Sequence, residues 1–220
     1  MREKHLTLGP LTVEEYLAFE DTSDRRHEFV GGRVYAVTGS TARHNRIVSN
    51  INGVLRTAAR GGPCSAYVID LKVRASRDRI YYPDGVVVCK PHDGDTLIFD
   101  EPCLILEVTS RSTRRIDRGE KLDAYLAMPS LRAYMIAEHD RRHVSLYTRQ
   151  LSGAWEREEI VTSGSITLPC PTMTLSLDDI YESVELPPLR IREGVIDDDF
   201  GEEEDDDEWA ELLDLSGERG

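Results

Sequence analysis

The spacing of hydrophobic and polar residues in the first part of the chain predicts two helices around a hairpin. Thr12-Val13-Glu14-Glu15 has the pattern of a capping box and begins a helix that runs to about residue 19. Residues 27–30 and 33–38 flank two glycines, as the strands of a hairpin do. Ser40 or Thr41 then caps a second helix, whose apolar face consists of Ile47, Val48, Ile51, Val54, Leu55 and Ala58.

The following part of the chain alternates apolar runs with helical patterns. The expected strands are residues 66–75, 80–89, 104–110, 132–137, 144–148 and 158–161, and the expected helices are residues 113–128 and 177–184. Because helices come before, between and after strands, the pattern predicts an α/β fold with a mixed β-sheet flanked by helices on both faces.

The charge distribution divides the chain into a nearly neutral body and an acidic tail. Leu186-Pro187-Pro188-Leu189 interrupts both helix and strand, so we expect one domain at residues 1–186 and a tail at residues 187–220. Residues 197–220 carry 13 acidic side chains and one basic side chain, which accounts for most of the formal net charge of −14. The body can therefore still carry a local basic surface for a phosphate backbone.

The tail has too much charge to form a core of its own. Its acidic run from Glu202 to Glu208 predicts disorder, because like charges repel and nothing apolar is buried. Trp209, Leu212 and Leu213 recur at helical spacing, so the tail can also bind a partner protein. Occupation of the protein's own basic groove is a third role, and the sequence leaves the three open.

The composition argues against a membrane protein and against a disulfide scaffold. No apolar run approaches the roughly 18 residues of a membrane helix, and the first residues lack an apolar signal core, so we expect a cytoplasmic protein. Cys64, Cys89, Cys103 and Cys170 are scattered without a Cys-x-x-Cys pair. This spacing favours separate, reduced, buried thiols over a zinc cluster or a set of disulfides.

Asp84 and Glu107 are the strongest candidates for chemistry, because each carboxylate lies in an apolar run. Burying a bare carboxylate is costly unless a cation, hydrogen-bond donors or a proton compensates for it. Two such groups on neighbouring strands, followed by a helix that carries Lys121, form a candidate site for a divalent metal. Strand alternation places Glu107 on the same face as Ile105 and Thr109.

Each candidate also has a purely structural explanation. Asp84 lies in Tyr-Pro-Asp-Gly, which is a common turn sequence. Lys121 follows Asp117 by four residues, which is the spacing of an exposed ion pair on a helix. Glu28 can pair with an arginine on the next strand, and His44 can be a histidine at the edge of the core.

A set of motifs occurs in a characteristic order along the body. The motifs are residues 11–17, the hairpin at 28–32, His44, Pro83-Asp84, Glu107-Val108-Thr109-Ser110, residues 117–121, Tyr125 and Tyr134-Met135-Ile136. Together they resemble the Uma-two family, a branch of the PD-(D/E)XK nuclease superfamily that is also catalogued as a domain of unknown function. The resemblance covers about residues 10–184 and leaves out the tail.

This resemblance implies a restriction-endonuclease-like fold and a metal-dependent endonuclease that cleaves DNA. It implies that Asp84 and Glu107 bind Mg²⁺ or Mn²⁺ and that Lys121 is the third catalytic group. In the superfamily the lysine usually lies two residues after the acidic residue, where this chain has Thr109. Lys121 therefore resembles the variant in which the lysine has migrated to the next helix. The further catalytic residues that the resemblance implies are Glu28 and His44.

Basic residues precede and accompany Lys121 in the sequence. The strip that we expect to contact the DNA backbone is Arg111, Arg114, Arg115 and Arg118, with a solvated helix face as the alternative. Two other functions stay open: a catalytically silent nuclease-fold protein that binds a partner through its tail, and a nuclease acting on RNA or on structured nucleic acid. The sequence does not determine the oligomeric state, and a homodimer is one arrangement that it allows.

Overall fold

The computed structural model describes residues 10–37, 39–68, 70–110 and 112–188. Arg111 and the tail from residue 189 onward lie outside the described residues, so the expectations for them, and for the domain limits, stay predictions. The described part up to Pro187 belongs to one compact unit. None of its described helices is long and apolar enough to cross a membrane.

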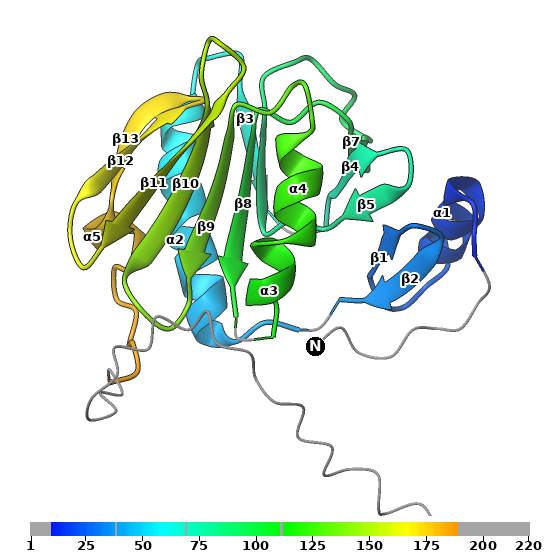
Figure 1. The fold of residues 1–220 in the computed structure, drawn as a ribbon, viewed down its shortest axis with the longest axis horizontal. Coiled ribbons are helices and arrows are strands. Elements are labelled where there is room, and N and C mark those ends of the chain that lie inside the picture. The colour runs from blue at the N-terminus through cyan, green and yellow to red at the C-terminus, as the bar shows by residue number, and fades with distance from the viewer. Residues whose placement is uncertain (1–9, 38, 69, 111, 189–220) are drawn as a thin grey trace, which may run out of the picture. The chain divides into compact units, whose positions relative to one another are not determined.

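A six-stranded sheet forms the middle layer of this unit, in the order β11-β10-β9-β8-β6-β3 (Figure 1). Neighbouring strands run antiparallel except for β8 and β9, which are parallel, so the sheet is mixed as predicted. Its strands are β3 (Ser65–Val68), β6 (Gly85–Val88), β8 (Leu104–Thr109), β9 (Ala133–Glu138), β10 (His143–Arg149) and β11 (Trp155–Val161).

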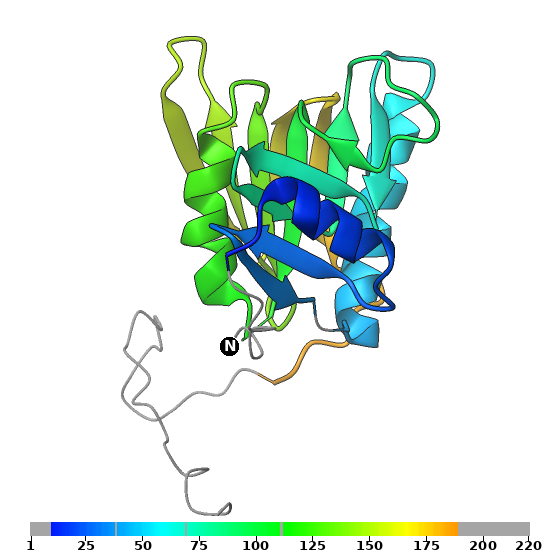
Figure 2. The same cartoon turned by 90° about the vertical axis from the view of Figure 1, so that its right-hand side faces the viewer.

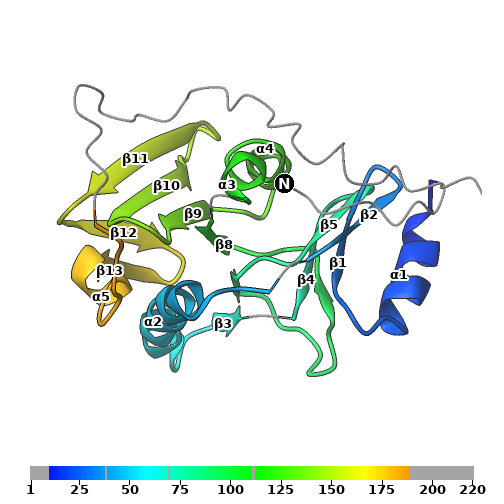
Figure 3. The same ribbon diagram turned by 90° about the horizontal axis from the view of Figure 1, so that it is seen from below.

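Helices cover both faces of this sheet, which confirms the predicted α/β arrangement (Figure 3). On one face, Ile47 of α2 packs with Leu104 and Leu106 of β8. On the other face, Tyr125 of α4 packs in the cluster that contains Ile105. The helices are α1 (Val13–Asp21), α2 (Ala42–Ala59), α3 (Arg114–Asp117), α4 (Glu120–Leu126) and α5 (Leu177–Ile180).

A second, five-stranded sheet has the order β2-β1-β5-β4-β7, and α1 lies across it (Figure 2). Tyr16 of α1 stacks on Phe29 with 5.0 Å between the ring centroids, and both pack with Val34 and Ile80. Thr12 caps α1 through the capping box that the sequence predicts. The strands are β1 (His27–Val30), β2 (Arg33–Ala36), β4 (Lys72–Ser76), β5 (Arg79–Tyr81) and β7 (Ile98–Phe99).

Two predicted strands are wrong in extent, because the chain changes sheets within each of them. The run at 66–75 divides into β3 and β4, and the run at 80–89 divides into β5 and β6. Asp70 adopts a left-handed φ of 72° at the first break, and Pro83, which lacks an N–H, lies at the second. Asp84 therefore lies at the junction between the two sheets, one residue before β6 begins.

The predicted helix at 113–128 is two helices, α3 and α4. Gly119 separates them with φ −120° and ψ −98°, and a Cβ atom there would lie 2.9 Å from the Arg115 carbonyl oxygen. Only glycine avoids this clash. The last helix ends at Ile180 instead of near residue 184, and the pattern missed the hairpin of β12 (Ser165–Pro169) and β13 (Thr172–Ser176).

The prediction of four separate cysteines is also wrong. Cys64 precedes β3, Cys89 follows β6, Cys103 precedes β8 and Cys170 lies in the turn between β12 and β13, yet their sulfur atoms lie together. Antiparallel pairing of β3 with β6 and of β6 with β8 aligns strand ends that are distant in sequence. Spacing along the chain could not show this convergence.

Candidate active site

The register of β6 and β8 places the two candidate carboxylates side by side. Gly85 pairs with Leu106, so the next position along both segments brings Asp84 opposite Glu107. The Val108 N–H donates a 2.7 Å hydrogen bond to Asp84 Oδ2 and holds this carboxylate against β8. The structure thus brings the pair together, while their role as metal ligands stays a prediction.

Glu107 faces α4 from the buried interior. Its side chain is 5% exposed. Its Oε1 atom accepts hydrogen bonds from Lys121 Nζ at 3.0 Å and from the Tyr125 hydroxyl at 3.2 Å. Tyr125 belongs to the same packed cluster as Ile105, so Glu107 lies on the face that strand alternation predicts.

Lys121 lies between carboxylates from three different elements. Its Nζ atom is 2.9 Å from Glu28 Oε1 on β1, 3.0 Å from Glu107 Oε1 on β8 and 3.6 Å from Asp117 Oδ1 on α3. The lysine side chain is 8% exposed, which contradicts the alternative of an exposed ion pair. Burial lowers the pKa of Lys121, but the surrounding carboxylates outweigh it and hold the pKa well above its usual value. The amine is therefore a charged ammonium.

His44 lies in the first turn of α2, the helix that covers the other face of the sheet from α4. Its side chain extends to Asp84. Its Nε2 atom is 3.2 Å from Asp84 Oδ2, and its buried Nδ1 atom has no hydrogen-bond partner among the described residues. Burial lowers the pKa of the imidazole, but the hydrogen bond and the charge of Asp84 raise it by more. His44 is therefore more strongly protonated near neutral pH than a free histidine.

Carboxyl groups outnumber basic groups in this cluster. One ammonium and one imidazole face the carboxylates of Glu28, Asp84, Glu107 and Asp117. Burial raises the pKa of Glu107; Lys121 lowers it, the other three carboxylates raise it, and the net shift is well upward. Burial likewise raises the pKa of Asp117, whose Oδ1 atom is buried without a hydrogen-bond partner among the described residues.

This donor set fits a hard divalent cation. Carboxylate oxygens are the side-chain ligands that Mg²⁺ and Mn²⁺ prefer. Asp84 and Glu107 offer such oxygens from adjacent strand positions, and Asp117 offers a buried oxygen that accepts no hydrogen bond from the described residues. The sequence pattern did not indicate Asp117 as a site residue. Asp117 precedes Lys121 by four residues, and this spacing could have indicated a shared site as well as an ion pair.

The arginines that follow β8 have several internal partners. Arg114 donates a 2.8 Å hydrogen bond to Glu138 Oε2, and Arg118 donates a 2.9 Å bond to Glu138 Oε1. The Glu138 side chain is fully buried, so these guanidinium groups balance an internal charge. Arg115 is exposed, and Arg111 lies outside the described residues. A contact of this strip with nucleic acid stays a prediction.

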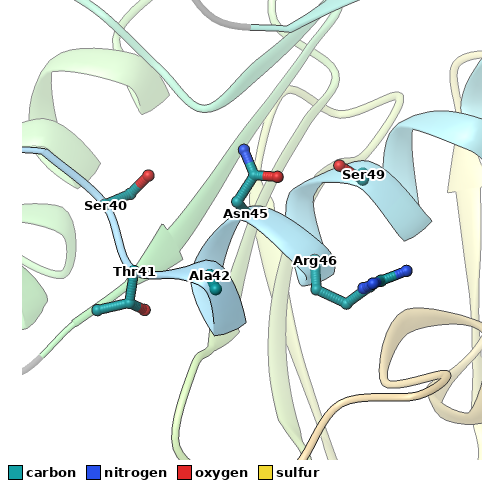
Figure 4. A pocket seen from close by; sticks show the side chains of 6 residues that line it. All are labelled: Ser40, Thr41, Ala42, Asn45, Arg46 and Ser49. Carbon is teal, nitrogen blue, oxygen red and sulfur yellow. The ribbon is translucent and has the colours of Figure 1, made fainter.

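A polar depression of about 500 Å³ lies along the first turns of α2, the helix that also carries His44 (Figure 4). Asn45 and Arg46 follow the histidine directly and line the depression. Its complete lining is Ser40, Thr41, Ala42, Asn45, Arg46 and Ser49. The sequence pattern predicted a helix cap, an apolar face and the candidate residue His44 in this segment, but not the depression.

Comparison with known proteins identifies relatives over most of the body. A model of the Uma2 family, described as "Putative restriction endonuclease", matches residues 13–179. The uncharacterized protein slr1290 of Synechocystis sp. is 30% identical over 176 residues, which are 79% of this chain and 93% of that protein. The uncharacterized protein sll1609 of the same organism is 27% identical over 155 residues, or 69% and 88% of the two chains.

A solved structure has a similar fold. The crystal structure of a protein from Anabaena variabilis, described as a "putative nuclease belonging to DUF820", matches with a TM-score of 0.66 and 18% identity. The match covers 78% of this chain and 98% of that one. The α/β fold predicted from the sequence is thus confirmed.

Proposed function

Because the chain belongs to the Uma2 family, we propose that it is a nuclease, specifically a metal-dependent endonuclease that hydrolyses phosphodiester bonds of DNA. One observation carries the proposal: Asp84 lies opposite Glu107, which binds the buried ammonium of Lys121, in a cluster with more carboxyl groups than basic groups. A structural ion pair needs one carboxylate for each cation, whereas a metal site needs an excess of carboxylates.

Asp84 and Glu107 are the residues that would hold Mg²⁺ or Mn²⁺, with Asp117 as a further oxygen donor. When bound, the ion lowers the pKa of water and neutralises charge on the phosphate. Lys121 is charged and held by Glu28 and Glu107, so it can orient the attacking water or stabilise the negative charge that develops on phosphorus.

In this proposal, Glu28 and His44 position the site residues Lys121 and Asp84. Glu28 holds the ammonium of Lys121 from β1, a strand of the second sheet. His44 holds Asp84 Oδ2, which also accepts the Val108 N–H. Each residue thereby limits the positions that its partner can take, and pre-positioned charges are the ones that stabilise a transition state best.

The exposed Arg115 supports a nucleic-acid backbone contact next to this site, because guanidinium groups bind phosphates. The proposal includes Arg111, Arg114 and Arg118 as neighbours in that contact. A cytoplasmic location, a homodimer and a partner for the acidic tail remain expectations from the sequence. They do not affect the chemistry of the site.

A cleavage assay tests the proposed function. The full chain should cut plasmid or linear DNA with Mg²⁺ or Mn²⁺ and lose this activity in EDTA. Single-stranded DNA and RNA in the same panel decide the substrate class. Asp84→Asn and Glu107→Gln should each lower the rate by about 100-fold or more, while Glu182→Gln, at an exposed position, should not change it.

The same panel separates the alternatives. If the protein cleaves only RNA, then RNA rather than DNA is its substrate, and the proposed mechanism is unchanged. A folded protein that cuts none of the substrates with either metal would instead be the catalytically silent interaction protein. An Asp84→Asn variant with full activity would remove Asp84 from the mechanism.

A further inference from the structure

The four cysteines of the chain converge from four separate segments on one cavity. Three lie at neighbouring strand ends of the central sheet, and Cys170 arrives from the turn between β12 and β13. The cavity has a volume of about 450 Å³, and all four cysteines line it. Cys103 and Cys170 are buried, and Cys64 and Cys89 are half-buried.

The sulfur atoms of the four cysteines lie close to one another. Cys89 Sγ is 3.3 Å from Cys103 Sγ and 3.1 Å from Cys170 Sγ. The sulfurs of Cys64, Cys89 and Cys170 all lie within 4.8 Å of one another. Four sulfurs bound to one tetrahedral zinc ion, with Zn–S bonds of about 2.3 Å, lie about 3.8 Å apart. The two Cys89 distances are shorter than that value and the 4.8 Å limit exceeds it, so small side-chain rotations would place the sulfurs around one ion.

Two disulfides are the competing explanation, because Cys64 lies within bonding distance of Cys89 and Cys103 within bonding distance of Cys170. The Cα atoms of Cys64 and Cys89 are only 3.8 Å apart, however, and disulfides usually join Cα atoms about 4.4–6.8 Å apart. Two separate disulfides also need not contact each other, whereas the Cys89 sulfur contacts the sulfurs of both Cys103 and Cys170. A shared ligand explains why all four sulfurs converge.

We propose that these four cysteines bind one Zn²⁺ ion as thiolates. Tetrahedral sites with four sulfur ligands select zinc or iron. An iron–sulfur cluster places its cysteines around several iron atoms and so needs sulfurs further apart. Each thiol that ligates zinc releases its proton to solvent. Arg132 lines the same cavity and supplies positive charge near the four thiolates.

The position of the site indicates a structural role. Cys89 lies five residues beyond Asp84 along β6, or about 17 Å at about 3.4 Å per residue. Four protein ligands also leave zinc no open position for water or substrate. The ion would instead join the ends of β3, β6 and β8 to the β12–β13 hairpin, which forms a separate two-stranded sheet.

Metal analysis of the full wild-type chain tests this proposal. After purification in reducing buffer and gel filtration through EDTA, mass spectrometry should find about one zinc ion per chain. X-ray absorption at the zinc edge should show four sulfur neighbours at about 2.3 Å. A mercurial reagent should release the zinc as the thiols react.

Three results would overturn the proposal. The first is a metal-free, reduced protein whose thiols all react with iodoacetamide. The second is two disulfides in unreduced peptides, and the third is zinc bound mainly through oxygen or nitrogen. Because these measurements need only the wild-type protein, they stand even if a cysteine variant does not fold.

Variants then test whether the zinc ion binds at the cysteine end of the sheet. Cys64→Ser, at a half-buried position, should lower zinc affinity by more than the roughly 10- to 100-fold that is typical of losing an outer hydrogen-bond partner. The matched control is Asp84→Asn, which removes a carboxylate from the other end and should keep its zinc. Zinc that is lost from Asp84→Asn and retained in Cys64→Ser would place the ion at the carboxylates and refute the four-cysteine site.

Discussion

The two ends of the β6–β8 strand pair differ in their chemistry although they belong to the same backbone. At one end, Asp84 and Glu107 offer oxygen atoms beside a buried ammonium. At the other end, Cys89 and Cys103 offer sulfur atoms 3.3 Å apart. Hard oxygen ligands suit Mg²⁺ and soft sulfur ligands suit zinc. One pair of strands can therefore support reaction chemistry at one end and a stabilising cross-link at the other.

The two ends also differ in how they balance charge. The carboxylate end contains an ammonium that contacts Glu28 and Glu107, and the Asp84 side chain is still 23% exposed. The cysteine end draws its members from the central sheet and from the β12–β13 hairpin, and all four cysteines line one cavity. A site with more carboxylates than basic groups is suited to binding a divalent cation, and a site with four protein ligands from separate segments is suited to holding two parts of the fold together.

The largest expected effect is on catalysis at the carboxylate end. Lys121→Met keeps much of the side-chain stem and removes its charge, so it should lower the cleavage rate by about 100- to 1000-fold, the scale of losing one preorganised electrostatic group. DNA affinity should change little. The matched control is Lys90→Met, because Lys90 pairs with Glu101 on the surface. Full activity of Lys121→Met in single-turnover measurements would refute the migrated-lysine mechanism.

The next effect is on stability at the cysteine end. Cys170→Ser removes one buried sulfur, and we expect it to lower the free energy of unfolding by about 3 kcal/mol and the melting temperature by about 6–12 °C. Calorimetry measures both quantities. Ser163→Ala, at an exposed position near the same hairpin, is the control. A melting temperature equal to that of the wild type would show that the four sulfurs do not cross-link the fold.

Metal affinity at the carboxylate end should depend on pH in a defined direction. The pKa of Glu107 is raised in the metal-free protein, so a proton must leave before the carboxylate can bind Mn²⁺. Affinity should therefore rise with pH above the usual pKa of glutamate, by up to about tenfold per pH unit for each proton released. Titration calorimetry in buffers of different ionisation enthalpy counts the protons. Glu107→Gln should bind Mn²⁺ more weakly and with a flatter pH dependence.

The smallest expected effect is that of the acidic tail on either end. Deletion of residues 190–220 should change the melting temperature by no more than about 1 °C, because a highly charged segment contributes little packing. If the tail competes with nucleic acid, the deletion should tighten DNA binding, most clearly at low salt. A large fall in melting temperature would show instead that Trp209 and the nearby leucines dock on the body.

The sequence by itself determined the features that depend on local periodicity and on capping. Thr12 and Thr41 form caps that the sequence pattern predicts. The apolar stripe of α2 packs as its spacing requires from Ile47 to Leu55, although Ala58, which was predicted on this face, is exposed and Ala59 is buried instead. Glu107 faces the side that strand alternation assigns to it. These features depend on residues a few positions apart, so a short segment contains enough information to specify them.

Only the tertiary structure decided which distant residues meet. Asp84 lies where the chain passes between two sheets, and Lys121 contacts Glu28, which lies on a strand of the other sheet. The four sulfurs converge because strand pairing and a hairpin turn bring their segments together. Hydrophobic periodicity specifies which face of an element is buried but not which element covers it. Strand order and register, which result from packing of the whole chain, decide that.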